Sequence, residues 1–154
     1  AGKLAKISAY GAALTIDARG SDPAALRKQV QAFVQERTLR ATEWKIFECS
    51  GQTAGQETAY GLLGLAGTLM VVGFTLGKIE VRLSNLMAFD ATVQGTWGCL
   101  PELYPATLKL VTSGKVTLKP FIERHPMSQG PEVLRRVADH EIHRRAILEP
   151  DWRE

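Results

Sequence analysis

Residues 43–74, EWKIFECSGQTAGQETAYGLLGLAGTLMVVGF, decide the fold of this chain. They predict a buried strand at 44–49, a helix from 53 to about 65, and a second buried strand at 68–74. The second strand is apolar on both faces, which is typical of a central strand in a parallel sheet. The order strand, helix, strand is one βαβ unit, and such units often bind nucleotides where their strands end.

The same alternation continues on both sides of this unit. A helix is expected to end at Tyr10 before Gly11, and Asp22 and Pro23 are a good N-cap and first residue for the next helix. Strands are predicted at residues 12–17, 79–83, 91–97, 116–123 and 145–148, and helices at 23–36, 101–113 and 131–140. This alternation favours the α/β class, with a partial doubly wound (Rossmann-like) parallel sheet.

The predicted sheet lacks its first strands. A doubly wound dinucleotide domain has the strand order 3-2-1-4-5-6. If residues 12–17 are its third strand, a gap two strands wide separates them from the fourth strand at 44–49. We therefore expect either that the chain is cut from a longer one or that it pairs with another copy.

Length and composition indicate an ordinary globular domain. The chain has 154 residues, of which 45% are hydrophobic and 23% charged. No apolar run reaches the roughly 18 residues that span a bilayer, and no secretory signal is visible, so we expect no membrane partner. The two cysteines, Cys49 and Cys99, form no CxxC pair, and a reducing cytoplasm is the simplest location.

The net charge of +3 does not predict a nucleic-acid partner. Basic residues are mostly interleaved with acidic ones, whereas a nucleic-acid binder gathers them on one face. The densest basic cluster is diluted by Asp139 and Glu141. Its members are Arg135, Arg136, His140, His143, Arg144 and Arg145. An anionic small ligand is a better match for this cluster than a nucleic-acid backbone.

Two motifs favour a structural interpretation over a functional one. Gly61, Gly64 and Gly67 have GxxGxxG spacing, but they run from helix into strand, and a phosphate-binding loop runs from strand into helix. Tight packing explains them better. His140 and His143 can share one helix face, yet no third metal ligand is evident beside them, so a solvated helix end is favoured.

Three other segments stay open between ligand binding and plain structure. Cys49 and Ser50 follow a strand and precede a helix, the position where α/β sheets bind ligands. Cys49 has no identifiable His or Asn partner, so a buried or cofactor-lining thiol is favoured over a nucleophile. The GTWG motif at 95–98 permits close approach by a flat ligand or forms an ordinary turn. Arg144 or Arg145 can pair with a pyrophosphate or lie on the surface.

Three stretches together resemble the C-terminal half of medium-chain, zinc-type alcohol dehydrogenases. They are GTLMVVGF at 67–74, RLSNLMAFDATVQGTWGCLPELYPATLKLVTSGKV at 82–116, and RRAIL at 144–148. SNLMAFDA and WGCLPELYPA further resemble the 6-hydroxycyclohex-1-ene-1-carbonyl-CoA dehydrogenases. The resemblance implies a parent enzyme that transfers hydride from a secondary alcohol, such as a cyclic hydroxyacyl-CoA thioester, to NAD.

The resemblance also implies a role for particular residues. The expected cofactor-binding residues are Cys49, Ser50, Gly51, Val72, Gly73, Phe74, Gly95, Thr96, Trp97 and Arg145. The first three would lie at the adenosine side, residues 72–74 along the nicotinamide ribose, and residues 95–97 by the carboxamide. Arg145 would reach the pyrophosphate. The strand at 91–97 would be the edge through which such enzymes form dimers, so a homo-oligomer is expected.

The resemblance leaves the catalytic residues outside this chain. The glycine-rich loop, the acidic residue for the ribose and the zinc ligands all belong to the N-terminal part of such enzymes. We therefore predict no catalytic and no metal-binding residue here, and no turnover by this chain alone. Residues 1–114 would be a partial dinucleotide-binding domain and residues 115–154 a segment that returns to the catalytic domain. The alternative is a non-catalytic nucleotide-binding or oligomerisation module.

Overall fold

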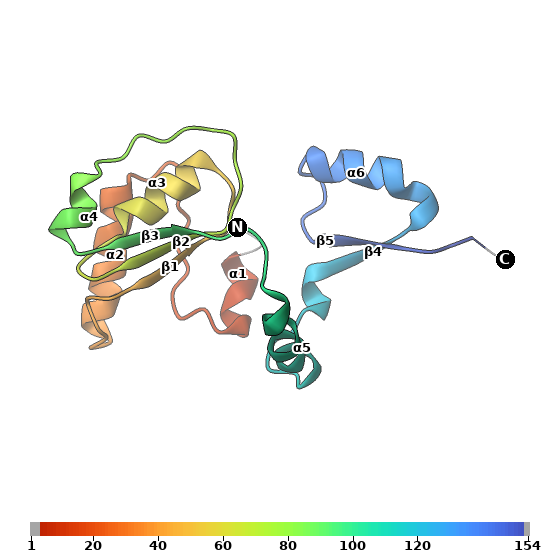
Figure 1. Cartoon of the computed structure of the whole chain (residues 1–154), viewed down its shortest axis with the longest axis horizontal. Helices are drawn as coiled ribbons and strands as arrows, with labels where there is room; N and C mark the ends of the chain where they lie inside the picture. The colour runs from red at the N-terminus through yellow and green to blue at the C-terminus, as the bar shows by residue number, and fades with distance from the viewer. Residues whose placement is uncertain (1–3, 153–154) are drawn as a thin grey trace. The chain divides into compact units, whose positions relative to one another are not determined.

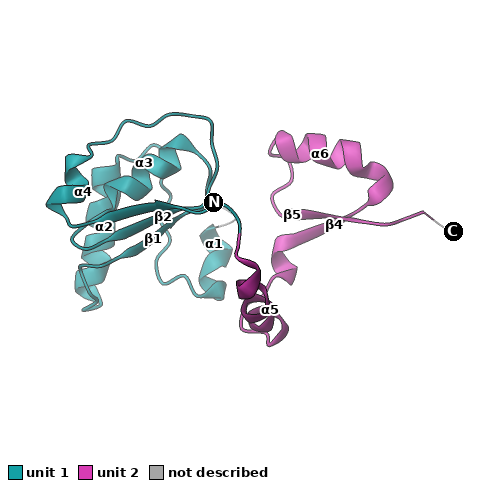
Figure 2. Ribbon diagram, viewed as in Figure 1, with its two compact units in different colours: residues 1–98 teal, residues 99–154 magenta. Residues whose placement is uncertain are grey.

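The computed structural model describes residues 4–152, and the chain divides into two compact units, Ala1–Gly98 and Cys99–Glu154 (Figure 2). Each unit has its own parallel sheet. The boundary predicted between residues 114 and 115 concerned which residues join a catalytic domain, and it stays a prediction. Within the described range, no helix is both long enough and apolar enough to cross a membrane.

The first unit is a three-stranded parallel sheet with helices (Figure 1). Its elements are α1 (Leu4–Ile7), η1 (Ser8–Tyr10), α2 (Pro23–Glu36), β1 (Lys45–Glu48), α3 (Thr53–Gly61), β2 (Thr68–Val71), α4 (Ser84–Ala88) and β3 (Thr92–Gly95). The strand order is β1-β2-β3, so the apolar strand at 68–71 is central, as its sequence predicted. The predicted α/β class with a parallel sheet is confirmed.

The βαβ unit predicted within residues 43–74 is present in the structure. β1 and β2 pair in parallel, with Lys45 opposite Thr68 and Glu48 opposite Val71. Helix α3 joins them and contacts both strands. Ala59, Leu63 and Leu69 form the buried core between α3 and the sheet. Side chains alternate along a strand, so this face takes Leu69 while Lys45 and Thr68 hydrogen-bond to each other on the other face.

Helix α2 has the predicted bounds and is fastened to α3. Pro23 occupies its first turn after Asp22, whose backbone is extended but whose side chain forms no capping hydrogen bond. Arg27 donates from its guanidinium to the main-chain oxygens of Gly61, at 3.2 Å, and Leu63, at 2.5 Å. Gly61 is the last residue of α3 and Leu63 lies just beyond its C-cap, so Arg27 supplies donors to carbonyls at the end of the helix.

The predicted strands at 12–17 and 79–83 are absent from the structure. Residues 12–17 have no strand partner, because no described strand lies beside them, and extended backbone needs a neighbour to form a ladder. Arg19 donates to Asp17 and holds the pKa of that carboxyl well below its usual range. Residues 79–83 alternate in polarity, but they form a loop that covers the sheet's α3 face.

Other element ends differ from the sequence-based prediction. The helix from 53 ends at Gly61, with Leu62 as its C-cap, rather than near residue 65. The predicted connector at 86–89 belongs largely to α4. β2 ends at Val71 rather than at residue 74, because the N–H groups of Val72 and Gly73 both turn to one carbonyl oxygen of β1. The strand at 91–97 is shortened to β3.

The second unit contains a two-stranded parallel sheet, with one helix packed against it. Its elements are η2 (Pro101–Leu103), α5 (Tyr104–Thr112), η3 (Lys119–Phe121), β4 (Ile122–Pro126), η4 (Met127–Gln129), α6 (Gly130–Ala138) and β5 (Arg145–Glu149). β4 pairs with β5 from Ile122 opposite Arg145 onward, and α6 contacts both strands. The strand predicted at 116–123 is displaced to 122–126, since Pro120 falls in η3 and removes a ladder donor.

Shortening the core leucine of β2 tests this packing. Leu69 is 3% exposed among the apolar side chains of α3 and the sheet. Leu69→Ala is expected to lower the free energy of unfolding of the first unit by about 2–5 kcal/mol, the usual cost of a core cavity. Leu76, which is 89% exposed, offers a matched control, and Leu76→Ala should change it by less than about 0.5 kcal/mol. Urea unfolding followed by far-UV circular dichroism measures both. Equal effects would refute the assigned core.

Candidate functional site

The carboxyl ends of the three strands in the first unit meet at one edge. Glu48 of β1 lies opposite Val71 of β2, and Val71 lies opposite Gly95 of β3. The segments that follow, residues 49–51, 72–74 and 96–97, therefore leave the sheet side by side (Figure 1). Nine of the ten residues predicted to bind a cofactor belong to this edge, with Gly95 as the last residue of β3. We call it the carboxyl edge.

Main-chain hydrogen bonds hold the three segments together. The N–H groups of Val72 and Gly73 both donate to the main-chain oxygen of Glu48, each at 2.8 Å. The N–H of Thr96 donates to the oxygen of Val71 at 3.1 Å. The three segments therefore leave the sheet from positions that main-chain hydrogen bonds fix.

Two glycines allow the first and second segments to approach each other. Gly51 has φ near +63°, and a methyl group there would lie 2.6 Å from the oxygen of Phe74. A methyl group on Gly73 would lie 2.6 Å from Oε2 of Glu48 and would collide with the nitrogen of Gly51. Cβ atoms do not occupy such positions, so the carboxyl edge needs glycine at both. The result is a close approach of two backbone segments, in which Gly51 and Gly73 are each half-buried.

Two aromatic rings border the same edge. Phe74 and Trp97 pack edge to face, with ring centroids 6.2 Å apart and planes at 76°. They are 68% and 87% exposed, which leaves a large apolar area to solvent. Cys49 is also exposed, and no described residue hydrogen-bonds its thiol. This arrangement can contact a flat apolar group, but it offers no general base beside the thiol.

The sequence-based prediction missed Glu48, which closes β1. It is 3% exposed and is the buried charged residue of the described range. Its Oε1 accepts the N–H and Oγ–H of Ser50 at 2.7 and 2.5 Å. The available pattern was an acidic residue at the end of an apolar strand, two positions before a serine that precedes a glycine. From its position in the sequence, Glu48 is predicted only to belong to the strand at 44–49.

Arg145 begins β5 in the second unit, so its predicted role at a pyrophosphate stays a prediction. Two of the six members of the basic cluster, Arg135 and Arg136, are paired with acidic residues. Arg135 forms ion pairs with Glu132 and Asp139 at 2.8 and 2.7 Å, and it lowers the pKa of Glu132. Arg136 pairs with Glu141 at 3.4 Å. These internal pairs reduce the positive charge that the cluster can offer to an anionic ligand.

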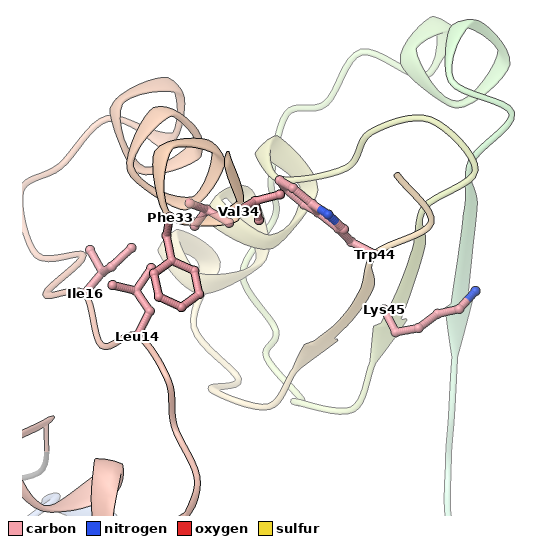
Figure 3. A pocket seen from close by; sticks show the side chains of 7 residues that line it. Leu14, Ile16, Phe33, Val34, Trp44 and Lys45 are labelled. Carbon is pink, nitrogen blue, oxygen red and sulfur yellow. The ribbon is translucent and has the colours of Figure 1, made fainter. Parts of the chain in front are cut away.

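A second feature of the first unit is an apolar cavity of about 510 Å³ beside the outer edge of β1 (Figure 3). Leu14, Ile16 and Phe33 gather on one side of it, and Trp44 and Lys45 stand at the other. Val30 and Val34 complete its lining. This cavity lies between the segment predicted as the third strand and the strand predicted as the fourth, where the sequence predicted a gap. Among the described residues, no strand pairs with β1 there.

The described residues contain no group of three or more histidine, cysteine or acidic side chains placed to hold a metal. His140 and His143 belong to no such group, and their interpretation as part of a solvated helix end stays a prediction. A dinucleotide is compatible with the carboxyl edge, because ligands of open α/β sheets bind outside the carboxyl ends of the strands and two backbone segments approach closely there. Residues 49–51, 72–74 and 95–97 are the groups that would hold it.

Comparisons with known proteins point in the same direction. Residues 1–113 match the sequence profile of the family described as zinc-binding dehydrogenase. A curated relative, D-xylulose reductase of Saccharomyces cerevisiae, is 28% identical over 98 residues, which are 63% of this chain and 28% of the relative.

Solved structures show the same fold. An alcohol dehydrogenase of Aeropyrum pernix is 25% identical with a TM-score of 0.78, over 97% of this chain and 40% of its own. Galactitol-1-phosphate dehydrogenase of Escherichia coli is 22% identical with a TM-score of 0.77, over 96% of this chain and 43% of its own. The chain thus spans less than half the length of these relatives.

A methyl group at Gly73 tests the close approach at the carboxyl edge. Gly73→Ala is expected to lower the free energy of unfolding by about 1–3 kcal/mol, because Glu48 and Gly51 must move aside. Gly95 has open space around its Cβ position and a negative-φ or extended backbone, so Gly95→Ala should change it by less than about 1 kcal/mol. Chemical denaturation of both variants measures the difference. A tolerated alanine at 73 would contradict the geometry.

Proposed function

Because residues 1–113 place the chain in the zinc-binding dehydrogenase family, we propose that it is part of an NAD-dependent dehydrogenase and supplies half of the cofactor groove. The observation that carries this proposal is the carboxyl edge. Nine of the ten residues expected to bind the cofactor leave adjacent strands there, and Gly51 and Gly73 let two of the segments approach each other closely. Ligands of open α/β sheets bind at such an edge.

In this proposal the carboxyl edge binds and orients NAD, while the chemistry depends on groups outside it. NAD supplies a nicotinamide that accepts hydride from the carbon of a secondary alcohol. Cys49, Ser50 and Gly51 face the adenosine side, residues 72–74 follow the nicotinamide ribose, and residues 95–97 approach the carboxamide. Phe74 and Trp97 exclude water from that end of the groove. The described residues hold no zinc site, so we assign no step through a metal to this chain.

We propose a cyclic hydroxyacyl-CoA as the substrate class, by resemblance to the 6-hydroxycyclohex-1-ene-1-carbonyl-CoA dehydrogenases. The exposed aromatic pair supports a flat, largely apolar ring at the nicotinamide end. The segments SNLMAFDA and WGCLPELYPA carry that narrower resemblance, and Trp97 belongs to the second of them.

The other half of the groove is proposed to come from strands that occupy the cavity beside β1. The cavity is apolar, and the outer edge of β1 has no described partner. Unpaired strand edges are templates for further strands. These strands can belong to a longer chain or to a second copy, and in either case they would continue the sheet past Trp44 and Lys45.

NAD binding tests the cofactor assignment. Isothermal titration of the chain with NAD is expected to give weak binding, with a Kd on the order of 1 mM, because only half of the contacts are present. Gly73→Ala should weaken it at least about fivefold by displacing Gly51. Leu134→Ala, an exposed change on α6, should leave it unaltered. No heat at any NAD concentration would contradict this function and favour the non-catalytic oligomerisation module.

The oligomeric state tests the proposed dimer edge. All four residues of β3 are exposed, and β3 has one described neighbour, β2. The N–H groups of Thr92 and Thr96 point to β2, so those of Val93 and Gly95 point outward. Val93→Pro removes an outward donor and should convert a dimer to a monomer in light scattering, with circular dichroism unchanged. A wild-type chain that is strictly monomeric would overturn the proposed edge.

A further inference from the structure

Glu48 occupies an unusual position for a carboxylate. It ends β1 beneath the carboxyl edge, and 3% of it is exposed. It also lines a smaller cavity of about 180 Å³, which is walled mainly by apolar side chains such as Val71, Ile79 and Val93. Burying a carboxylate is unfavourable unless hydrogen bonds replace its hydration. Glu48 accepts hydrogen bonds from both neighbouring segments of the carboxyl edge.

One carboxylate oxygen of Glu48 fixes the first segment of the carboxyl edge. Oε1 accepts the N–H of Ser50 at 2.7 Å and its Oγ–H at 2.5 Å. The same Oγ accepts the N–H of Gln52, the N-cap of α3, at 3.2 Å. The carboxylate thus determines the course of the chain from β1 into α3, across Gly51.

The rest of Glu48 fixes the second segment. Its main-chain oxygen accepts the N–H groups of Val72 and Gly73. Its other carboxylate oxygen, Oε2, has no hydrogen-bond partner in the described structure and lies against Gly73, where a methyl group would be 2.6 Å away. The side chain therefore sits between the two segments, with Ser50 on one side and Gly73 on the other.

We propose that Glu48 is a positioning residue that sets the spacing between the Ser50–Gly51 and Val72–Phe74 segments for the dinucleotide. This inference rests on the proposed function, because those two segments are its cofactor contacts. Glu48 does not touch the cofactor in this account. Its side chain orders the first segment and its main chain orders the second, so one residue at the end of β1 holds both.

Amide hydrogen exchange of the complete 154-residue chain tests this role without any ligand. In Glu48→Ala the Ser50 amide loses its charge-assisted acceptor, and its exchange should speed up at least about tenfold. The amides of Val72 and Gly73 bond to the main chain of residue 48, so they should stay within about threefold of wild type. Glu48→Gln keeps an acceptor oxygen and should restore Ser50 to within about threefold.

Equal acceleration of all three amides in Glu48→Ala would show a merely structural role and overturn the proposal. An unchanged Ser50 amide would do the same. If the alanine variant does not fold, the glutamine variant decides alone: a Ser50 amide at least about tenfold faster despite the retained acceptor, with Val72 and Gly73 unchanged, would overturn the proposed contact.

NAD titration links the positioning role to the function. Glu48→Ala should weaken NAD binding at least about fivefold, and Glu48→Gln should restore it to within about twofold. Unaltered NAD affinity in a folded alanine variant would overturn the proposal while leaving the proposed function intact. Absence of NAD binding by the wild-type chain would instead sink the proposed function, and the exchange pattern of Ser50 would still report whether Glu48 orders its segment.

Discussion

The main-chain oxygen of Glu48 accepts two N–H groups, those of Val72 and Gly73, and the rest of the carboxyl edge depends on this pair of bonds. In a regular parallel ladder each carbonyl oxygen accepts one hydrogen bond. The second hydrogen bond to the oxygen of Glu48, from Gly73, therefore ends the ladder and turns the chain at the end of β2. The turn brings Gly73 against Gly51 at a distance that excludes a Cβ atom. Two backbone segments therefore pass close beside each other, and a third follows from Gly95.

The same sheet explains why the unit is suited to be part of something larger. Its central strand is paired on both sides, whereas β1 and β3 each have one described neighbour. The two outer edges differ in character. The edge of β1 borders an apolar cavity next to α2, which favours further strands of the same sheet, while β3 presents four exposed residues on a flat edge. The chain belongs to the zinc-binding dehydrogenase family and spans less than half the length of the solved dehydrogenases that share its fold.

The spacing of apolar residues predicted the elements whose formation depends on burying one of their own faces. The βαβ unit and helix α2 follow from apolar spacing, proline and glycine, and they are found nearly as expected. The prediction of a strand at 12–17 was wrong, because a strand is stable only beside a partner strand. The sequence pattern of one segment does not show whether such a partner is present. The alternation at 79–83 reflects a loop with one side on the sheet. Of the site, the segments were predictable from the resemblance, but the burial of Glu48 was not, because it depends on two segments meeting in space.

The most direct test of the central claim is a residue-resolved NMR titration of the chain with NAD. The account predicts that amide signals of residues 49–51, 72–74 and 95–97 move together along one binding curve. Those lining the cavity beside Trp44, and those of α5, should stay in place. Movement confined to the cavity or to the second unit, or three segments that follow different curves, would contradict a single cofactor site at the carboxyl edge.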